Sequence, residues 1–269
     1  SGLVGSEMCI RDRPCIFSFF KFITFNNMSA SKIIKVNATR STNDKVKMLI
    51  KSKKISNKTI LSANYQYGGR GQYNNRWFSS NRKNLLCSLY IDFPAIKINN
   101  SFVINCAVSL AVLKTIKNYE KSNTVIKWPN DILSGNKKIS GILIENIIKN
   151  NSISHSIIGV GINVNQLIFR NLSSATSIKK LSGKHINTDE ILKKLIENYN
   201  YYFSKIQMSK LLLNEYNENL YGRDECNFIL KGKSLKGRVN QVKEDGKIEI
   251  ISDMTGKEKY SSDKIKIIF

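Results

Sequence analysis

The chain has 269 residues, of which 41% are apolar, so it is long enough to bury a core and is not disordered as a whole. It carries 43 basic and 20 acidic residues, a net charge of +23, and only three prolines. The scarcity of proline excludes collagen-like and polyproline architectures. The sequence contains no run of 18 apolar residues, so it predicts no membrane span.

The positive charge is spread along the chain rather than concentrated in one segment. The densest clusters, at 51–58 and 179–184, contain no interleaved aromatic residues that could stack on bases. We interpret the excess as a solvated basic surface, with a surface suited to an acidic partner as the alternative. Five cysteines without a CxxC spacing predict neither a disulfide framework nor a zinc site, and two histidines argue against a His-dependent triad.

Residues 1–27 differ from the rest of the chain. The segment SGLVGSEMCIRDR has no helical or strand periodicity and resembles a translated sequencing adapter. The apolar stretch that follows is short, is interrupted by Lys21 and lacks a small-residue cleavage site. We therefore predict a disordered or artefactual leader before Met28, no export signal and a cytoplasmic location.

From Met28 onward, the pattern predicts strands and helices in a mixed order. A strand over 32–36 precedes Ser41, Thr42 and Asn43, which are suited to capping a helix. Further strands are predicted over 59–63, 85–91 and 125–128, with an apolar helix over 102–116 and a polar, Gly-rich loop over 64–84. Residues 139–148 and 156–164 predict an antiparallel hairpin.

The C-terminal third changes character at Gly222. Asn187 and Glu190 resemble a capping box that opens a helix through about Ile206, and a second helical segment continues to Leu220. After Gly222, short strands are predicted over 227–230, 234–242, 247–251 and 265–268. The sequence thus predicts a mixed domain over 28–221 and a small β-barrel over 222–269.

Three segments carry glycine and charge beside apolar strands. In GGRGQYNNRW (68–77), the glycines let backbone N–H groups approach an anion that Arg70 and Arg76 could neutralise; the alternative is a flexible basic loop. In KWPNDILSGNKKISGILIE (127–145), Asp131 and Lys138 are expected to face each other across one pocket, with a surface ion pair as the alternative. Gly141 within an apolar strand indicates close approach of a ligand or backbone. The third segment is IIGVGINVN (157–165), which is not a Rossmann fingerprint.

Taken together and in this order, the three segments resemble the motifs of biotin–protein ligases, also called biotin–[acetyl-CoA-carboxylase] ligases. The resemblance covers about residues 30–240, and its most specific part is KWPND followed by GILIE. It implies an α+β fold with a mixed, largely antiparallel sheet flanked by helices, similar to the catalytic domain of class II synthetases. The segment KGRVNQVKEDGKIEI resembles the SH3-like C-terminal barrel of that family.

The resemblance also implies an activity. Family members join biotin to AMP with MgATP and pass the biotinoyl group to a lysine of a biotin carboxyl carrier domain. The implied biotin contacts are Ser41, Thr42, Asn43, Gln66, Gly69, Arg70, Gly71, Gln72, Lys138 and Gly141. The implied ATP or adenylate contacts are Arg70, Gln72, Trp77, Asn130, Lys138 and Asn163. Lys138 and Arg70 would offset anionic repulsion in the first step. In the second step, Asp131 would orient the acceptor amine or accept its proton.

Several further expectations follow from the same resemblance. Magnesium should arrive with ATP rather than on a protein-only site, and the protein should be a monomer or homodimer that binds no specific nucleic acid and no membrane. Fewer than 30 residues precede Met28, which predicts a monofunctional ligase without an N-terminal DNA-binding domain. Gln72 stands where the family often has arginine, which predicts a mobile loop that leaks adenylate.

Three other interpretations remain open at this point. A lipoate–protein ligase would share the fold and the two-step chemistry, although KWPND and GILIE favour the biotin branch. A basic nucleic-acid-binding protein would explain the net charge. An inactive homologue would act only as a binding module.

Overall fold

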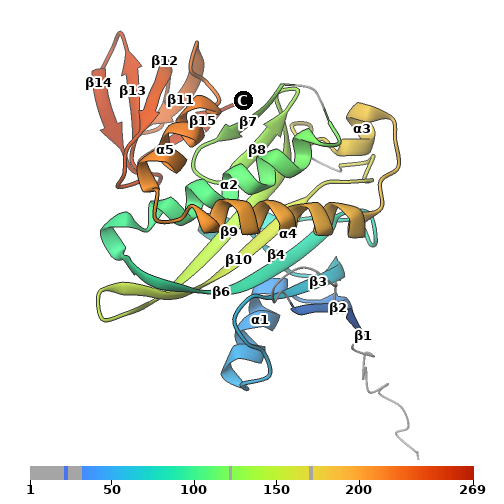
Figure 1. Ribbon diagram of the computed structural model, residues 1–269. Helices are drawn as coiled ribbons and strands as arrows, with labels where there is room; N and C mark the ends of the chain where they lie inside the picture. The colour runs from blue at the N-terminus through green and yellow to red at the C-terminus, as the bar shows by residue number, and fades with distance from the viewer. Residues whose placement is uncertain (1–20, 24–31, 121–122, 170–171) are drawn as a thin grey trace, which may run out of the picture.

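The computed structural model describes residues 21–23, 32–120, 123–169 and 172–269 (Figure 1). Its centre is an eight-stranded sheet in the order β1-β2-β3-β6-β10-β9-β8-β7, in which all pairs are antiparallel except β2 with β3. The strands are β1 (Lys21–Ile23), β2 (Lys32–Thr39), β3 (Thr59–Gln66), β6 (Leu85–Lys97), β7 (Thr124–Lys127), β8 (Asp131–Ser134), β9 (Lys137–Lys149) and β10 (Ser152–Ile162). The predicted α+β class with a largely antiparallel sheet is confirmed.

Helices cover both faces of this sheet because its strands are apolar on both sides. Helix α1 (Thr42–Lys51) packs on one face, where Val46 joins a small core with Ile34 and Leu61. Helices α2 (Phe102–Lys117) and α4 (Thr188–Ser204) lie side by side on the other face and build the main core (Figure 1). The shorter helices are α3 (Ile178–Ser182) and α5 (Ser209–Glu218), with 3₁₀ turns η1 (Gln72–Asn74) and η2 (Ile98–Asn100).

The C-terminal strands form a second, antiparallel sheet in the order β14-β13-β12-β11-β15. Its strands are β11 (Cys226–Leu230), β12 (Lys233–Val242), β13 (Ile248–Ser252), β14 (Gly256–Tyr260) and β15 (Ile265–Ile268). The predicted barrel is wrong in one respect: β14 and β15 end the sheet and do not pair with each other, so within the described residues the sheet is open. Its apolar side chains, including Phe228 and Ile250, belong to the same core as α2 and α4.

Five strands and helices were missed by the periodicity, and one segment excluded from the fold takes part in it. Strand β8 is only four residues long, β14 (GKEKY) has no apolar alternation, and α3 is a five-residue helix. The two-residue strands β4 (Gly69–Arg70) and β5 (Arg76–Trp77) lie in the predicted loop. Strand β1 lies inside the predicted leader, where Lys21–Ile23 pair with β2. The rest of the leader lies outside the described residues. The predicted domain boundary at 221/222 remains a prediction.

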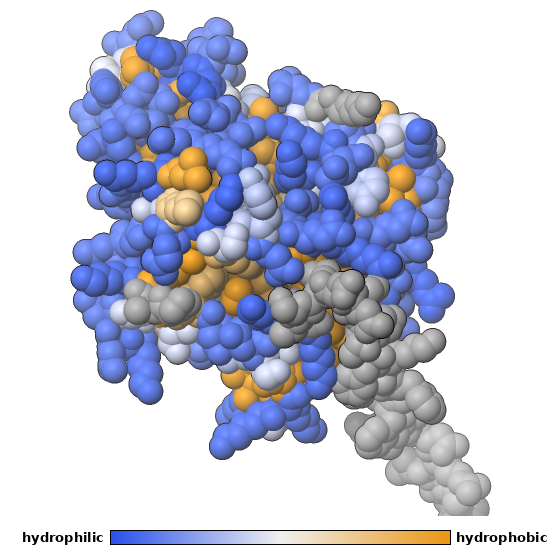
Figure 2. Space-filling model, in the orientation of Figure 1, coloured by the Kyte–Doolittle hydropathy of each residue, from blue (hydrophilic) through white to orange (hydrophobic). Residues whose placement is uncertain are grey.

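The exposed surface agrees with the composition. The face of the molecule in Figure 2 is mostly hydrophilic, with apolar side chains in smaller patches. No helix in the described ranges is long and apolar enough to cross a membrane.

Candidate functional site

A cavity of about 760 Å³ opens where the two sheets meet, and its size is typical of a small-molecule site. It is bounded by the start of α1, by β9 and β10, by the β7–β8 turn and by the C-terminal sheet. It also receives the small hairpin of β4 (Gly69–Arg70) and β5 (Arg76–Trp77). Twelve of the predicted site residues line it: Ser41, Thr42, Asn43, Gln66, Arg70, Gly71, Gln72, Trp77, Asn130, Asp131, Lys138 and Gly141.

Two predicted residues do not line the cavity. Gly69 pairs with Trp77 in the hairpin, and a Cβ on Gly69 would lie 2.6 Å from the Trp77 carbonyl oxygen. Asn163 is buried just after β10, where its backbone N–H donates to Ile139 and its carbonyl accepts from Ile178. The structure therefore gives Gly69 a packing role in the hairpin and places Asn163 outside the cavity wall.

The cavity wall formed by β9 and β10 carries a patch of glycines. Gly141 and Gly161 are register partners, and the Trp77 indole lies against both. A Cβ on Gly141 would lie 3.0 Å from the Trp77 ring, and one on Gly161 would lie 2.5 Å from it. On the same wall, a Cβ on Gly159 would collide with the Asn43 side-chain amide. The glycines in these strands thus make room for neighbouring side chains that shape the site.

The β7–β8 turn brings three charged side chains together. Lys138 Nζ lies 2.6 Å from Asp131 Oδ1, and Lys127 Nζ lies 3.4 Å from Asp131 Oδ2. Burial lowers the pKa of Lys127, as does the charge of Lys138, whereas the Asp131 carboxylate opposes the shift. Lys138 remains about one-third exposed toward the cavity and lies 5.8 Å from the centroid of the Trp77 ring. Asp131 and Lys138, predicted to face each other, are therefore in direct contact.

The turn itself is held by polar contacts on both sides. The Trp128–Pro129 peptide bond is cis, and the Trp128 indole donates to the Gly246 carbonyl oxygen of the C-terminal sheet at 2.9 Å. Asn130 donates its side-chain amide to the Ile142 carbonyl at 2.8 Å and accepts the Ile142 N–H on its own carbonyl. Asn130 thus fixes the turn to β9 and keeps Asp131 beside Lys138.

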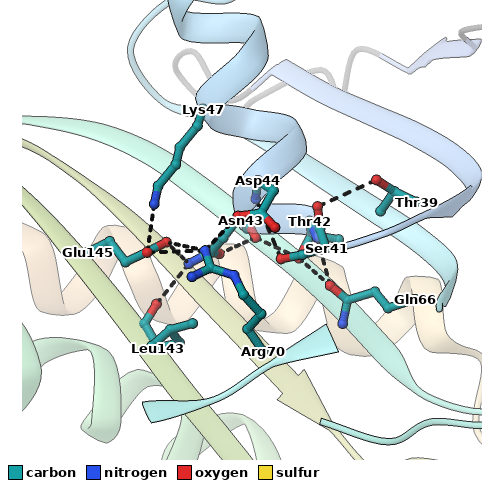
Figure 3. Close-up of polar contacts among 11 residues, drawn as sticks. Thr39, Ser41, Thr42, Asn43, Asp44, Lys47, Gln66, Arg70, Leu143 and Glu145 are labelled. Atoms are coloured by element: carbon teal, nitrogen blue, oxygen red, sulfur yellow. Dashed lines mark hydrogen bonds and ion pairs between the residues drawn. The ribbon is translucent and has the colours of Figure 1, made fainter. Parts of the chain in front are cut away.

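A hydrogen-bonded network forms the wall at the start of α1 (Figure 3). Ser41 caps the helix, and Gln66 Oε1 accepts from both the backbone N–H and the hydroxyl of Thr42. Ser88, a buried residue of β6 that the sequence did not single out, has its hydroxyl within hydrogen-bond distance of both Thr42 Oγ1 (2.7 Å) and Asn43 Oδ1 (2.6 Å). These bonds hold the predicted residues rigidly at one end of the cavity.

Arg70 is bound by acidic residues that sequence analysis missed. Its Nη2 lies 2.6 Å from Asp44 Oδ1 and 3.1 Å from Glu145 Oε1 (Figure 3). Glu145 lies on β9 and also accepts from Asn43 and Lys47. The glutamate closes the GILIE segment, but only the fold shows what it contacts.

The C-terminal sheet supplies a part of the cavity that the sequence did not predict. Lys231, Lys264, Lys266 and the Phe269 ring line it, and Lys127 Nζ lies 4.9 Å from the centroid of that ring. Counting Arg70, Arg76, Lys127 and Lys138, the lining holds seven basic side chains and two acidic ones. Such a lining favours a ligand with several negative charges.

Comparisons with known proteins place this site in context. The model of the biotin/lipoate A/B protein ligase family matches residues 36–163. Over 142 residues the chain is 32% identical to the bifunctional ligase/repressor BirA of Bacillus spizizenii, covering 51% of this chain and 43% of that protein. Over 140 residues it is 27% identical to the biotin–[acetyl-CoA-carboxylase] ligase of Mycobacterium tuberculosis, covering 51% of each.

The fold is similar to that of solved biotin protein ligases. The structure from Aquifex aeolicus in complex with biotin and ATP superimposes with a TM-score of 0.72 at 23% identity, covering 88% of this chain and 98% of that one. The chain matches only about half the length of the curated relatives.

Proposed function

We propose that this chain, whose residues 36–163 match the model of the biotin/lipoate A/B protein ligase family, activates biotin with ATP and transfers it to a protein lysine. The observation that carries the proposal is one cavity in which Lys138, Asp131, Trp77 and the wall formed by Asn43 come together. These residues belong to segments that lie far apart in the sequence.

In the first half-reaction, a biotin carboxylate oxygen attacks the α-phosphorus of ATP. The bond from that phosphorus to the bridging oxygen breaks, and pyrophosphate leaves with the electron pair. Two anions must approach each other, so Lys138 offsets their repulsion and the charge that develops on the phosphoryl oxygens. Asp131 orients Lys138 through their 2.6 Å contact. Magnesium carried by ATP would shield the polyphosphate charge.

The second half-reaction transfers the biotinoyl group to an acceptor lysine of a biotin carboxyl carrier domain. The neutral amine attacks the carbonyl carbon of biotinoyl-AMP, the carbonyl–oxygen bond to AMP breaks, and AMP leaves. The amine must first lose a proton whose ordinary pKa is about 10.4. We assign Asp131 to orient this amine or accept its proton, because its carboxylate lies at the cavity wall beside Lys138.

The polarity of the two ends supports a binding mode. The wall of Thr42, Asn43 and Gln66 offers amide and hydroxyl groups suited to a neutral, hydrogen-bonding ring system such as the ureido ring of biotin. The lysines of the C-terminal sheet lie at the basic side of the cavity and suit the polyphosphate. Lys138 lies on the wall where the carboxylate and α-phosphate would meet.

The test is biotin-dependent ATP–pyrophosphate exchange with purified protein, run beside lipoate. Exchange with biotin alone, lost in Lys138→Ala, supports the assignment. Exchange with lipoate alone moves the protein to the lipoate branch of the same family. No exchange with either compound refutes the adenylation step and leaves a binding module.

A further inference from the structure

The hairpin of β4 and β5 projects over the cavity and carries two of its basic residues, Arg70 and Arg76. The charge of Arg70 is already engaged by Asp44 and Glu145, at 2.6 and 3.1 Å. Among the described residues, Arg76 makes no ion pair and is exposed. The two arginines of one hairpin are thus in opposite situations.

Glu145 is the centre of the contacts around Arg70. Its carboxylate accepts from Lys47 at 2.7 Å, from Asn43 at 2.8 Å and from Arg70 at 3.1 and 3.2 Å (Figure 3). Partial burial raises the pKa of Glu145, but the hydrogen bonds from Lys47 and Asn43 and the charge of Arg70 outweigh it and hold the pKa below its ordinary value. Two acids and two bases balance here, so this cluster has no net charge to offer a ligand.

The position of Arg70 determines the rest of the hairpin. Arg70 pairs with Arg76 and Gly69 with Trp77, and the Gly71 N–H donates to the Asn75 carbonyl at 2.7 Å. A guanidinium held on α1 and β9 therefore restrains the indole that lies on the glycine wall. It also determines where Arg76 projects.

We propose that Asp44 and Glu145 are positioning residues that hold Arg70, and that Arg70 keeps the hairpin over the cavity instead of binding the reacting phosphate. Arg76 is then the cation that the hairpin presents to an anionic ligand. The identity of that ligand rests on the proposed function, whereas the restraint of the hairpin does not.

Amide hydrogen exchange of residues 69–77 tests the restraint without any substrate. In Glu145→Gln we expect about tenfold faster exchange of this segment, and a larger increase when Asp44→Asn is added, because local opening controls exchange. Glu197→Gln is the matched control, since Glu197 forms an exposed ion pair with Lys194 at 2.8 Å, away from the cavity. If the Glu145→Gln and Asp44→Asn variants exchange no faster than Glu197→Gln, the proposal is wrong.

Pyrophosphate exchange separates positioning from direct contact with ligand. If Arg70 only holds the hairpin, Arg70→Ala and the Asp44→Asn/Glu145→Gln double variant lower activity by the same factor, and the triple variant loses no more. If Arg70 binds the phosphate, Arg70→Ala is at least tenfold worse than the double variant, which overturns the proposal. Should the wild type catalyse no exchange, the proposed function fails, while hydrogen exchange still decides the role of Asp44 and Glu145.

Discussion

The contact of the Trp77 indole with Gly161 gives a sharp test of the cavity geometry. In Gly161→Ala the new Cβ would lie 2.5 Å from Trp77 Cε2, 2.6 Å from Cζ2 and 2.8 Å from Nε1. Non-bonded carbons rest at about 3.5–4.0 Å, so the indole must move back by roughly 1 Å. Overpacking of this kind costs about 1–3 kcal/mol.

The displaced indole would carry its hairpin with it. Trp77 is the register partner of Gly69, and its ring lies beside Lys138. A 1 Å misplacement at an active site can cost about 100-fold in rate. We therefore expect Gly161→Ala to lower kcat/KM for biotin-dependent pyrophosphate exchange by about 10–100-fold, or ~1.4–2.7 kcal/mol.

Two further variants show whether the indole is the cause. Gly141→Ala should lose less activity, because its Cβ would lie 3.0 Å from the indole and 3.3 Å from Lys138 Cε. Trp77→Phe has a smaller ring and should make Gly161→Ala less harmful. Wild-type activity in Gly161→Ala, or losses that simply multiply in the double variant, would refute the reasoning.

Three other substitutions probe the charges. Asp131→Asn should slow transfer from preformed biotinoyl-AMP and lower the thermal midpoint, since it leaves Lys127 without its buried partner; transfer at the wild-type rate would remove Asp131 from the second half-reaction. Lys266→Ala should raise the KM for ATP several-fold but leave the KM for biotin unchanged. Lys259→Ala on β14, outside the cavity, is the control. If the two variants have the same KM for ATP, Lys266 does not bind ATP. Burial works to raise the pKa of Glu249, but its hydrogen bonds and nearby lysines lower that pKa to about 2, so its stabilising contribution is complete above about pH 4.5 and is lost as the pH falls toward 2. Glu249→Gln should flatten the acid unfolding curve in that window, and an unchanged curve would contradict the pKa.

The parts of the site formed by residues close in sequence could be predicted, because each motif spans a strand and the turn that follows it. Strand β7 ends at Lys127, before Pro129, and the chain returns along β8 and β9, where Asp131 lies opposite Gly141 and Lys138 opposite Leu133, close enough for their side chains to meet. The partners of Arg70 could not be predicted, since Glu145 is 75 residues away and only the register of β9 brings it near. The mobility predicted for the loop at Gln72 remains a prediction; Tyr73, beside Gln72, shares a 2.5 Å hydrogen bond with Ser262.

Whether the C-terminal strands close into a barrel could not be predicted from the sequence for a related reason. Alternation identifies strands but not which strands end a sheet, so the pattern after Gly222 could not reveal that β14 and β15 remain unpaired with each other. For the same reason, the sequence did not predict that the C-terminal sheet lines the cavity. Lys231 and Lys266 appear in the sequence as ordinary solvated lysines, and only the packing of the second sheet against the first turns them toward a shared space.

The distribution of charge indicates which end of the cavity each ligand occupies. On the large sheet Lys138 and Lys127 share Asp131, and on the β4–β5 hairpin Arg70 is held by Asp44 and Glu145, so these three cations are partly neutralised before a ligand arrives. The exposed lysines of the C-terminal sheet are less neutralised: of the three, only Lys264 has a neighbouring acid, Asp263 at 3.5 Å, among the described contacts. A polyphosphate therefore gains most from the C-terminal side and from Arg76 of the hairpin, whereas an uncharged ring gains most from the hydrogen-bonding wall at α1. The two ligands can thus bind at opposite ends and meet at Lys138, beside the Trp77 ring.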